Sequence, residues 1–149
     1  MTDSPKEVVA ALWSSLAARD WPAVGQVLAG ECIYYDVPTG PAVAARGPRD
    51  ILARLRLGLE PLASYENYDG RMVGEGETVM YEHSERWQWP SGETVVLPFV
   101  SVHRVVAGRI ALWADYWDYS TLINAAPPGW TETLMSADMS WIYDATGEI

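Results

Sequence analysis

The stretch TVMYEHSERWQWPSGETVVLPFVSVHRVVAGRIALWADYWDY, residues 78–119, decides the fold. It contains three long runs rich in aromatic and β-branched residues, Thr78–Trp89, Thr94–Val106 and Ile110–Tyr119. Only the turn sequences PSGE and AGR separate these runs, and both are too short for a crossover connection. Strands joined so closely pair antiparallel, so we expect a meander.

Further elements are predicted upstream of this meander. Ser64–Val73 and Cys32–Val37 are predicted strands because they are rich in aromatic and β-branched residues. Ser4-Pro5-Lys6-Glu7 is typical of a helix start, with an N-cap, a proline in the first turn and a glutamate at the third position. Shorter signals predict a second helix after Asp20 and a third over Pro48–Leu59. Helices followed by an antiparallel run of strands indicate the α+β class.

The pattern breaks downstream at AAPPG, residues 125–129. Apolar residues at loosely helical spacing follow, beginning at Trp130. We therefore expect one domain over residues 1–126, with residues 127–149 as an appendage that packs back on it.

Charge and composition exclude several functions. The net charge of −10 opposes binding to nucleic acid and to anionic membrane surfaces. The single cysteine allows no intramolecular disulfide, and the two histidines lack the spacing of a zincin, so no metal site is predicted. No signal sequence or long apolar run is evident, which favours the cytoplasm.

The later strands carry apolar residues on both faces, as Val96 and Val100 alternate with Leu97 and Phe99. Helices can cover one face of a sheet, and a second subunit is the simplest cover for the other. We therefore expect a homodimer.

Asp115 is the most informative polar residue. It shares one face of its predicted strand with Trp113 and Trp117, where an unpaired charge would be costly. Arg86 is a plausible partner for it, in either a catalytic site or a structural ion pair. Tyr34 and Asp36 also share a face, either in a pocket or at a solvated strand end before a proline.

Four motifs, in order and in context, carry a resemblance to a known family: Tyr34-Tyr35-Asp36-Val37-Pro38, Gly47-Pro48-Arg49-Asp50, Glu85-Arg86-Trp87-Gln88 and the run from Ala107 to Asp118. They resemble the Y-x-N-x-P, G-R-D-like, E-R-x-D and W-x-D-Y-F-D segments of limonene-1,2-epoxide-hydrolase-like proteins. The resemblance covers about residues 4–124. It implies the nuclear-transport-factor-2-like fold, in which three helices wrap a curved, mixed or antiparallel sheet into a cone.

The resemblance also implies one-step acid–base hydrolysis of an epoxide, without a metal, cofactor or covalent intermediate. By this likeness Asp115 is the base that activates water, Tyr34 positions the water, and Arg86 bridges two carboxylates. The acid position holds Gln88, which has no proton to transfer, and the asparagine position holds Asp36. If Asp36 and Asp115 are close, their like charges should raise one pKa, so that one can serve as acid and the other as base.

Three functions remain open. The first is an epoxide-hydrolase-like enzyme acting on a small or medium apolar molecule. The second is an acid–base isomerase, dehydratase or cyclase acting on a polyketide-like or terpenoid substrate, and the third is a binding domain without catalysis. Eight Trp and eight Tyr beside a single Phe suit either a pocket wall that binds an apolar ligand and still offers hydrogen bonds, or a packed core with a subunit interface. The residues expected to contact the substrate are Trp113, Trp117, Phe99 and Leu97.

Overall fold

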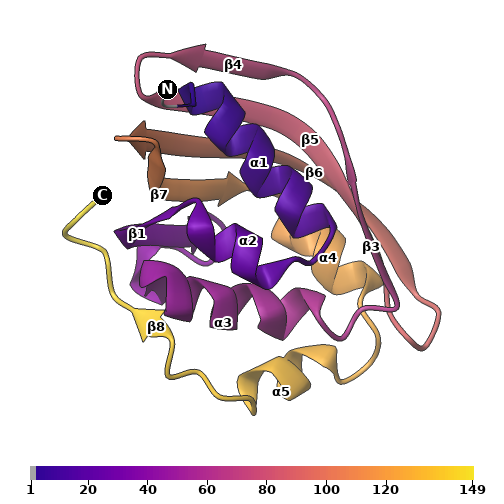
Figure 1. Cartoon of the computed structure of the whole chain (residues 1–149). Helices are drawn as coiled ribbons and strands as arrows, with labels where there is room; N and C mark the ends of the chain where they lie inside the picture. Colours follow the sequence, from indigo (N-terminus) through magenta and orange to yellow (C-terminus); the bar gives the residue numbers. More distant parts are fainter. Residues whose placement is uncertain (1–2) are drawn as a thin grey trace.

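Three N-terminal helices cover one face of a curved, mixed sheet in the computed structural model, which describes residues 3–149 (Figure 1). The helices are α1 (Pro5–Ala17), α2 (Trp21–Gln26) and α3 (Gly47–Leu59). The predicted start of α1 is confirmed, because the Ser4 hydroxyl accepts from the Glu7 amide at 3.2 Å and the Glu7 side chain caps in return. The apolar faces of α1 and α3 pack on the sheet and form the core with it.

The sheet has the strand order β3-β5-β6-β7-β1-β2-β8, with β4 paired to β5. The strands are β1 (Leu28–Asp36), β2 (Ala44–Arg46), β3 (Ser64–Tyr68), β4 (Met72–Glu75), β5 (Thr78–Gln88), β6 (Thr94–Val106), β7 (Arg109–Tyr116) and β8 (Ile142–Tyr143). The predicted antiparallel meander is confirmed in β5, β6 and β7. Strand β1 joins β7 in parallel, in a register that sets Tyr34 beside Trp113 and Asp36 beside Asp115. This parallel pairing brings together residues that are about 80 positions apart in the sequence.

Three strands differ from the prediction, and the first of them, β1, begins at Leu28 rather than at Cys32. The predicted strand over residues 64–73 is broken into β3 and β4, because the chain at Gly70 passes so close to β5 that a Cβ there would lie 2.0 Å from the Glu82 carbonyl oxygen. The last strand ends at Tyr116, and Asp118 caps the short helix α4 (Tyr119–Ala125) by accepting from the Thr121 amide at 2.9 Å. A capping residue thus replaces the end of the predicted strand.

The C-terminal segment packs on the rest of the chain. It contains the short helix α5 (Trp130–Met135) and β8, which adds to the sheet edge at β2. Trp141 and Ala145 are buried there. None of the helices within residues 3–149 is long and apolar enough to cross a membrane.

The sheet face opposite the helices exposes a band of apolar side chains. Met80, Val96, Val100, Val106 and Tyr116 are each at least 39% exposed, and they lie on the neighbouring strands β5, β6 and β7. Ion pairs flank the band: Arg71 contacts Glu82 at 2.8 Å, and Arg86 contacts Glu66 at 3.9 Å. Because these charges are neutralised in pairs, two copies can meet on this face despite the acidic surface.

We therefore expect a homodimer that buries this band. Val100→Asp would place a charge in the contact and should convert the dimer to a monomer in light scattering at micromolar concentration. Ile142→Asp is the matched control, since Ile142 is an exposed apolar residue at the β8 edge and should leave the dimer intact. A monomeric wild-type protein would contradict this prediction.

Candidate active site

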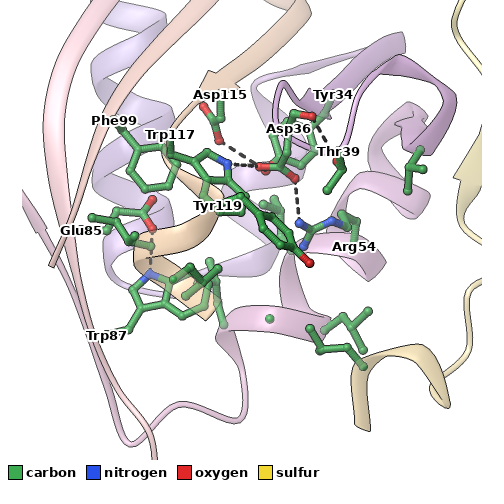
Figure 2. Close-up of a pocket in the computed structure, with 18 of the residues that line it drawn as sticks. Tyr34, Asp36, Thr39, Arg54, Glu85, Trp87, Phe99, Asp115, Trp117 and Tyr119 are labelled. Carbon is green, nitrogen blue, oxygen red and sulfur yellow. Dashed lines mark hydrogen bonds and ion pairs between the residues drawn. The ribbon is translucent and has the colours of Figure 1, made fainter. Parts of the chain in front are cut away.

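A cavity of about 250 Å³ lies between α3, the inner sheet face and the C-terminal helices (Figure 2). Most of its wall is apolar and much of it is aromatic. The aromatic residues of the wall are Tyr34, Trp87, Phe99, Trp113, Trp117, Tyr119, Trp130 and Trp141. The C-terminal segment therefore completes the cavity, with residues from Trp130 to Trp141.

Three carboxyl groups interrupt this apolar wall. Asp36 comes from the end of β1, Asp115 from β7 and Glu85 from β5. Each of these residues is at most 5% exposed. A buried carboxylate loses its hydration, so each needs hydrogen-bond donors or a proton.

Asp36 is held by an ion pair and two neutral donors. Arg54 of α3 donates from Nη2 to Asp36 Oδ2 at 2.7 Å. Trp117 Nε1 and the Tyr34 hydroxyl donate to Oδ1 at 2.9 and 3.0 Å. Because the guanidinium is permanently charged, these contacts stabilise Asp36 as a carboxylate.

Asp115 has only neutral hydrogen-bond partners. Trp113 Nε1 donates to its Oδ1 at 2.7 Å, and Ser101 Oγ lies 2.6 Å from the same oxygen. The Tyr34 hydroxyl lies 3.3 Å from Oδ2 and so bridges Asp115 to Asp36. Burial raises the pKa of Asp115 well above its usual value, and the nearby charge of Asp36 raises it further.

Glu85 is the third carboxyl group of the wall. The Tyr65 hydroxyl donates to its Oε1 at 2.9 Å, and Trp87 Nε1 donates to Oε2 at 2.8 Å. Burial raises its pKa to about 7, which outweighs the lowering by these two donors.

Most of the residues predicted from the sequence meet in this cavity. Tyr34, Asp36 and Asp115 lie within hydrogen-bond distance of one another through the Tyr34 hydroxyl. The residues expected to contact a substrate also lie in the cavity wall: Trp113, Trp117, Phe99 and Leu97.

Arg86 and Gln88 lie elsewhere, and their predicted place beside Asp115 is wrong. Both side chains are on the outer face of β5, where Arg86 contacts Ser64 and Glu66 and Gln88 contacts Ser64. The other face of β5 carries large apolar side chains, and their burial decides which way the strand turns. Glu85 and Trp87 face the cavity as a result.

Sequence reasoning missed Arg54 and Glu85. Glu85 shares one face of its strand with Tyr81, Trp87 and other bulky residues. A charge on an apolar face is the same pattern that singled out Asp115. Arg54 lies one helical turn after Ile51, at the border of the buried face of α3. Its contact with Asp36 depends on how α3 crosses β1, which no local pattern shows.

A family model described as the limonene-1,2-epoxide hydrolase catalytic domain matches residues 3–127. The chain belongs to this family. No curated protein gives a significant match to this chain.

Solved structures that resemble this chain have the same fold as the limonene-1,2-epoxide hydrolase family. A Mycobacterium tuberculosis epoxide hydrolase of this type has 23% sequence identity and a TM-score of 0.71, over 91% of this chain and 98% of that one. A protein proposed to be a SnoaL-like polyketide cyclase, from Shewanella denitrificans OS-217, has 16% identity and a TM-score of 0.74, over 81% of this chain and 95% of that one. An NTF2-like protein of unknown function from Burkholderia pseudomallei K96243 has 21% identity and a TM-score of 0.70, over 81% of this chain and 95% of that one. The fold is therefore nuclear-transport-factor-2-like, as expected.

Within the limonene-1,2-epoxide hydrolase family, the fold supports a catalytic or a ligand-binding domain. Residues 3–149 contain no group of three or more His, Cys, Asp or Glu side chains arranged to hold a metal ion. The titratable groups of the cavity wall are the ion pair of Asp36 and Arg54, the tyrosines Tyr34 and Tyr119, and the carboxyls Glu85 and Asp115. Burial raises the pKa of Tyr34, Glu85 and Asp115.

Proposed function

We propose that this protein is an acid–base enzyme that opens an epoxide on a small or medium apolar molecule by adding water, without a cofactor. The observation that carries the proposal is the group of three carboxyls, Asp36, Glu85 and Asp115, on the wall of an apolar cavity. A cavity that only binds an apolar ligand gains nothing from three buried carboxyls, because each one costs desolvation energy. An enzyme that takes a proton from water and gives one to a substrate oxygen does need carboxyl groups in its cavity.

The base comes from the pair formed by Asp36 and Asp115. The Tyr34 hydroxyl bridges the two carboxyls, so their like charges cannot both be present at low cost. The pair is therefore most stable with one proton and one negative charge, in the manner of other carboxyl pairs that activate water. The charged member accepts a proton from water, and Tyr34 orients that water.

The acid is Glu85. Its two oxygens each accept a hydrogen bond, so the proton of the neutral carboxyl is free to reach a substrate oxygen in the cavity. A pKa of about 7 suits a group that must give up a proton near neutral pH and regain it afterwards. Glu85 thus supplies the proton that Gln88 cannot.

The wall also indicates the kind of substrate. Aromatic rings form much of the cavity wall, and its polar groups are few. A ring-shaped hydrocarbon with one oxygen function suits such a wall, because it buries apolar surface and offers one acceptor.

The proposal is tested with limonene oxide and cyclohexene oxide in water enriched in oxygen-18. We expect diols that carry one labelled oxygen, since water is the nucleophile. An absence of diol from a panel of cyclic epoxides, with folded protein, would contradict the proposal.

Isomerisation or cyclisation is the second candidate. It is favoured by the bridge from Tyr34 to Asp115, since a tyrosine beside a buried neutral carboxyl stabilises enolates in ketosteroid isomerase. An isomerase would give a product of unchanged mass with no label from water. The same labelling experiment therefore separates the two reactions.

The pH dependence of stability tests the pKa of Glu85. This pKa is raised from 4.5 to about 7 in the folded state, so between these values the unfolded chain binds fewer protons than the folded one. Stability should therefore decrease as pH rises from about 4.5 to about 7, by up to about 3 kcal/mol from this group, and then level off. Denaturant titrations of the wild type and of Glu85→Gln check this, and the variant should show the weaker pH dependence. Equal pH dependence in both would contradict the assignment.

A further inference from the structure

We propose that a hydrogen-bond chain from the protein surface holds the proton of the carboxyl pair on Asp115 and leaves Asp36 as the charged base. The inference rests on the proposed function for its catalytic meaning only, since the protonation of Asp115 can be measured without a substrate. The members of the chain, from the surface inward, are Asp69, Tyr81, Asn67, His83, Ser101 and Asp115.

Asp69 fixes the direction of the hydrogen bonds at the surface end of this hydrogen-bond chain. This residue is exposed, and its carboxylate lies 2.5 Å from the Tyr81 hydroxyl. A carboxylate can only accept, so the phenol donates its single proton to Asp69. The pKa of Tyr81 is raised to about 12 by burial and by this bond to Asp69, so the phenol keeps its proton. The Tyr81 oxygen therefore accepts from the Asn67 side chain, 3.0 Å away.

That contact orients the Asn67 amide. Its Nδ2 faces Tyr81, so its Oδ1 faces His83 Nδ1 at 2.7 Å. An amide oxygen can only accept, so His83 carries a hydrogen on Nδ1. Each hydrogen bond from the Asp69 carboxylate to the His83 imidazole thus has its donor and acceptor set by the previous one.

His83 is neutral, so its other nitrogen has no hydrogen. The imidazole stacks on Tyr81 at 4.4 Å and packs against Trp13 at 4.2 Å and Phe99 at 5.4 Å between ring centroids. This apolar packing disfavours a positive charge, and burial lowers the pKa of His83 to about 3. With the hydrogen on Nδ1, Nε2 is an acceptor.

The last step decides the state of Asp115. Ser101 Oγ lies 2.9 Å from His83 Nε2, and the single hydroxyl proton of Ser101 goes to this nitrogen. Ser101 Oγ also lies 2.6 Å from Asp115 Oδ1, and two oxygens this close need a proton between them. That proton belongs to the Asp115 carboxyl, which is therefore neutral with its proton on Oδ1.

The surroundings of Asp115 are consistent with this assignment. The titratable or charged side chains that face it from neighbouring elements are Tyr34 and Asp36 on β1, Arg54 on α3, Tyr65 on β3, and His83 and Glu85 on β5. The only cation of this group contacts Asp36. The charge of the pair therefore resides on Asp36, which receives the single hydroxyl proton of Tyr34, and Asp115 Oδ2 is left as a neutral carbonyl oxygen that faces the cavity. This reverses the role of base that the family resemblance implies for Asp115.

Infrared spectroscopy of the carboxyl carbonyl stretch tests the assignment. In a Glu85→Gln background at pH 8, we expect a protonated-carboxyl band that disappears in Asp115→Asn. Asn67→Asp places a carboxylate against His83 Nδ1 and favours the imidazolium, which then donates to Ser101, so that Ser101 donates to an ionised Asp115. The band should therefore disappear in Asn67→Asp as well. Val73→Asp adds the same charge on exposed β4 and should keep the band.

Nitrogen-15 NMR of His83 gives a second measurement. We expect the neutral tautomer with hydrogen on Nδ1 in the wild type and an imidazolium in Asn67→Asp. No Asp115 band in the wild type, a hydrogen on Nε2 of neutral His83, or an unchanged band in folded Asn67→Asp would each overturn the inference. Because no substrate is used, these outcomes stay separate from failure of the protein to hydrolyse epoxides.

Discussion

Asp36→Asn should lower turnover of a cyclic epoxide by roughly 10²–10⁴-fold, because it removes the charged member of the carboxyl pair. It should also destabilise the fold, since Arg54 loses the carboxylate that it contacts at 2.7 Å. Because the Arg54 side chain is still 26% exposed, we expect the cost of leaving it unpaired to be about 3 kcal/mol, the lower end of the range for a broken buried ion pair. For a chain of this size this corresponds to a fall in Tm of roughly 6–12 °C. Steady-state kinetics and thermal unfolding measure the two effects.

A double variant separates catalysis from stability. Asp36→Asn combined with Arg54→Met removes both charges and should regain much of the lost Tm, because no charge is left unpaired. Its turnover should stay as low as in Asp36→Asn. Recovery of turnover together with stability would show that Asp36 acts through the fold, and another base would then be required.

Glu85→Gln should lower turnover by a similar factor of roughly 10²–10⁴, because the amide has no proton to give to the substrate oxygen. Wild-type turnover should fall as pH rises through about 7, where Glu85 loses its proton. This fall should be absent from the residual activity of the variant. The variant should remain folded, since an amide in a buried site carries no desolvation cost for a charge.

Gln88→Glu is the matched control on the same strand. Gln88 faces the outer side of β5 and contacts Ser64, so a carboxyl there cannot reach the cavity. Turnover should match the wild type. If Gln88→Glu instead increased epoxide hydrolysis, or if Glu85→Gln kept full activity, the acid would have to be sought elsewhere.

The sequence predicted the fold class because its signals are local. The strand runs of residues 78–119, their short turns and the capped first helix all depend on neighbours within a few positions. The faces of β1 and β7 were equally readable: Tyr34 and Asp36 share one face, and Asp115 shares another with Trp113 and Trp117. The parallel pairing of β1 with β7 then brought these two faces together, as the resemblance implied.

The choice of face on β5 shows where motif matching fails. Alternation alone divides the strand into two sets, one with Glu85 and one with Arg86 and Gln88. The matched motif favoured the second set. Burial of the bulky residues that share a face with Glu85 outweighs that short match, so the strand turns Glu85 inward.

By itself the sequence determined the three N-terminal helices, the long strands that pair through short turns, and that a carboxyl on β7 lies on an apolar face. The tertiary structure alone decided the partners of that carboxyl. Arg54 meets Asp36 because α3 packs across β1, and Ser101 and His83 meet Asp115 because β5, β6 and β7 lie side by side in one register. Protonation follows from these contacts, because a pKa depends on burial and on charges that are close in space but distant in the chain.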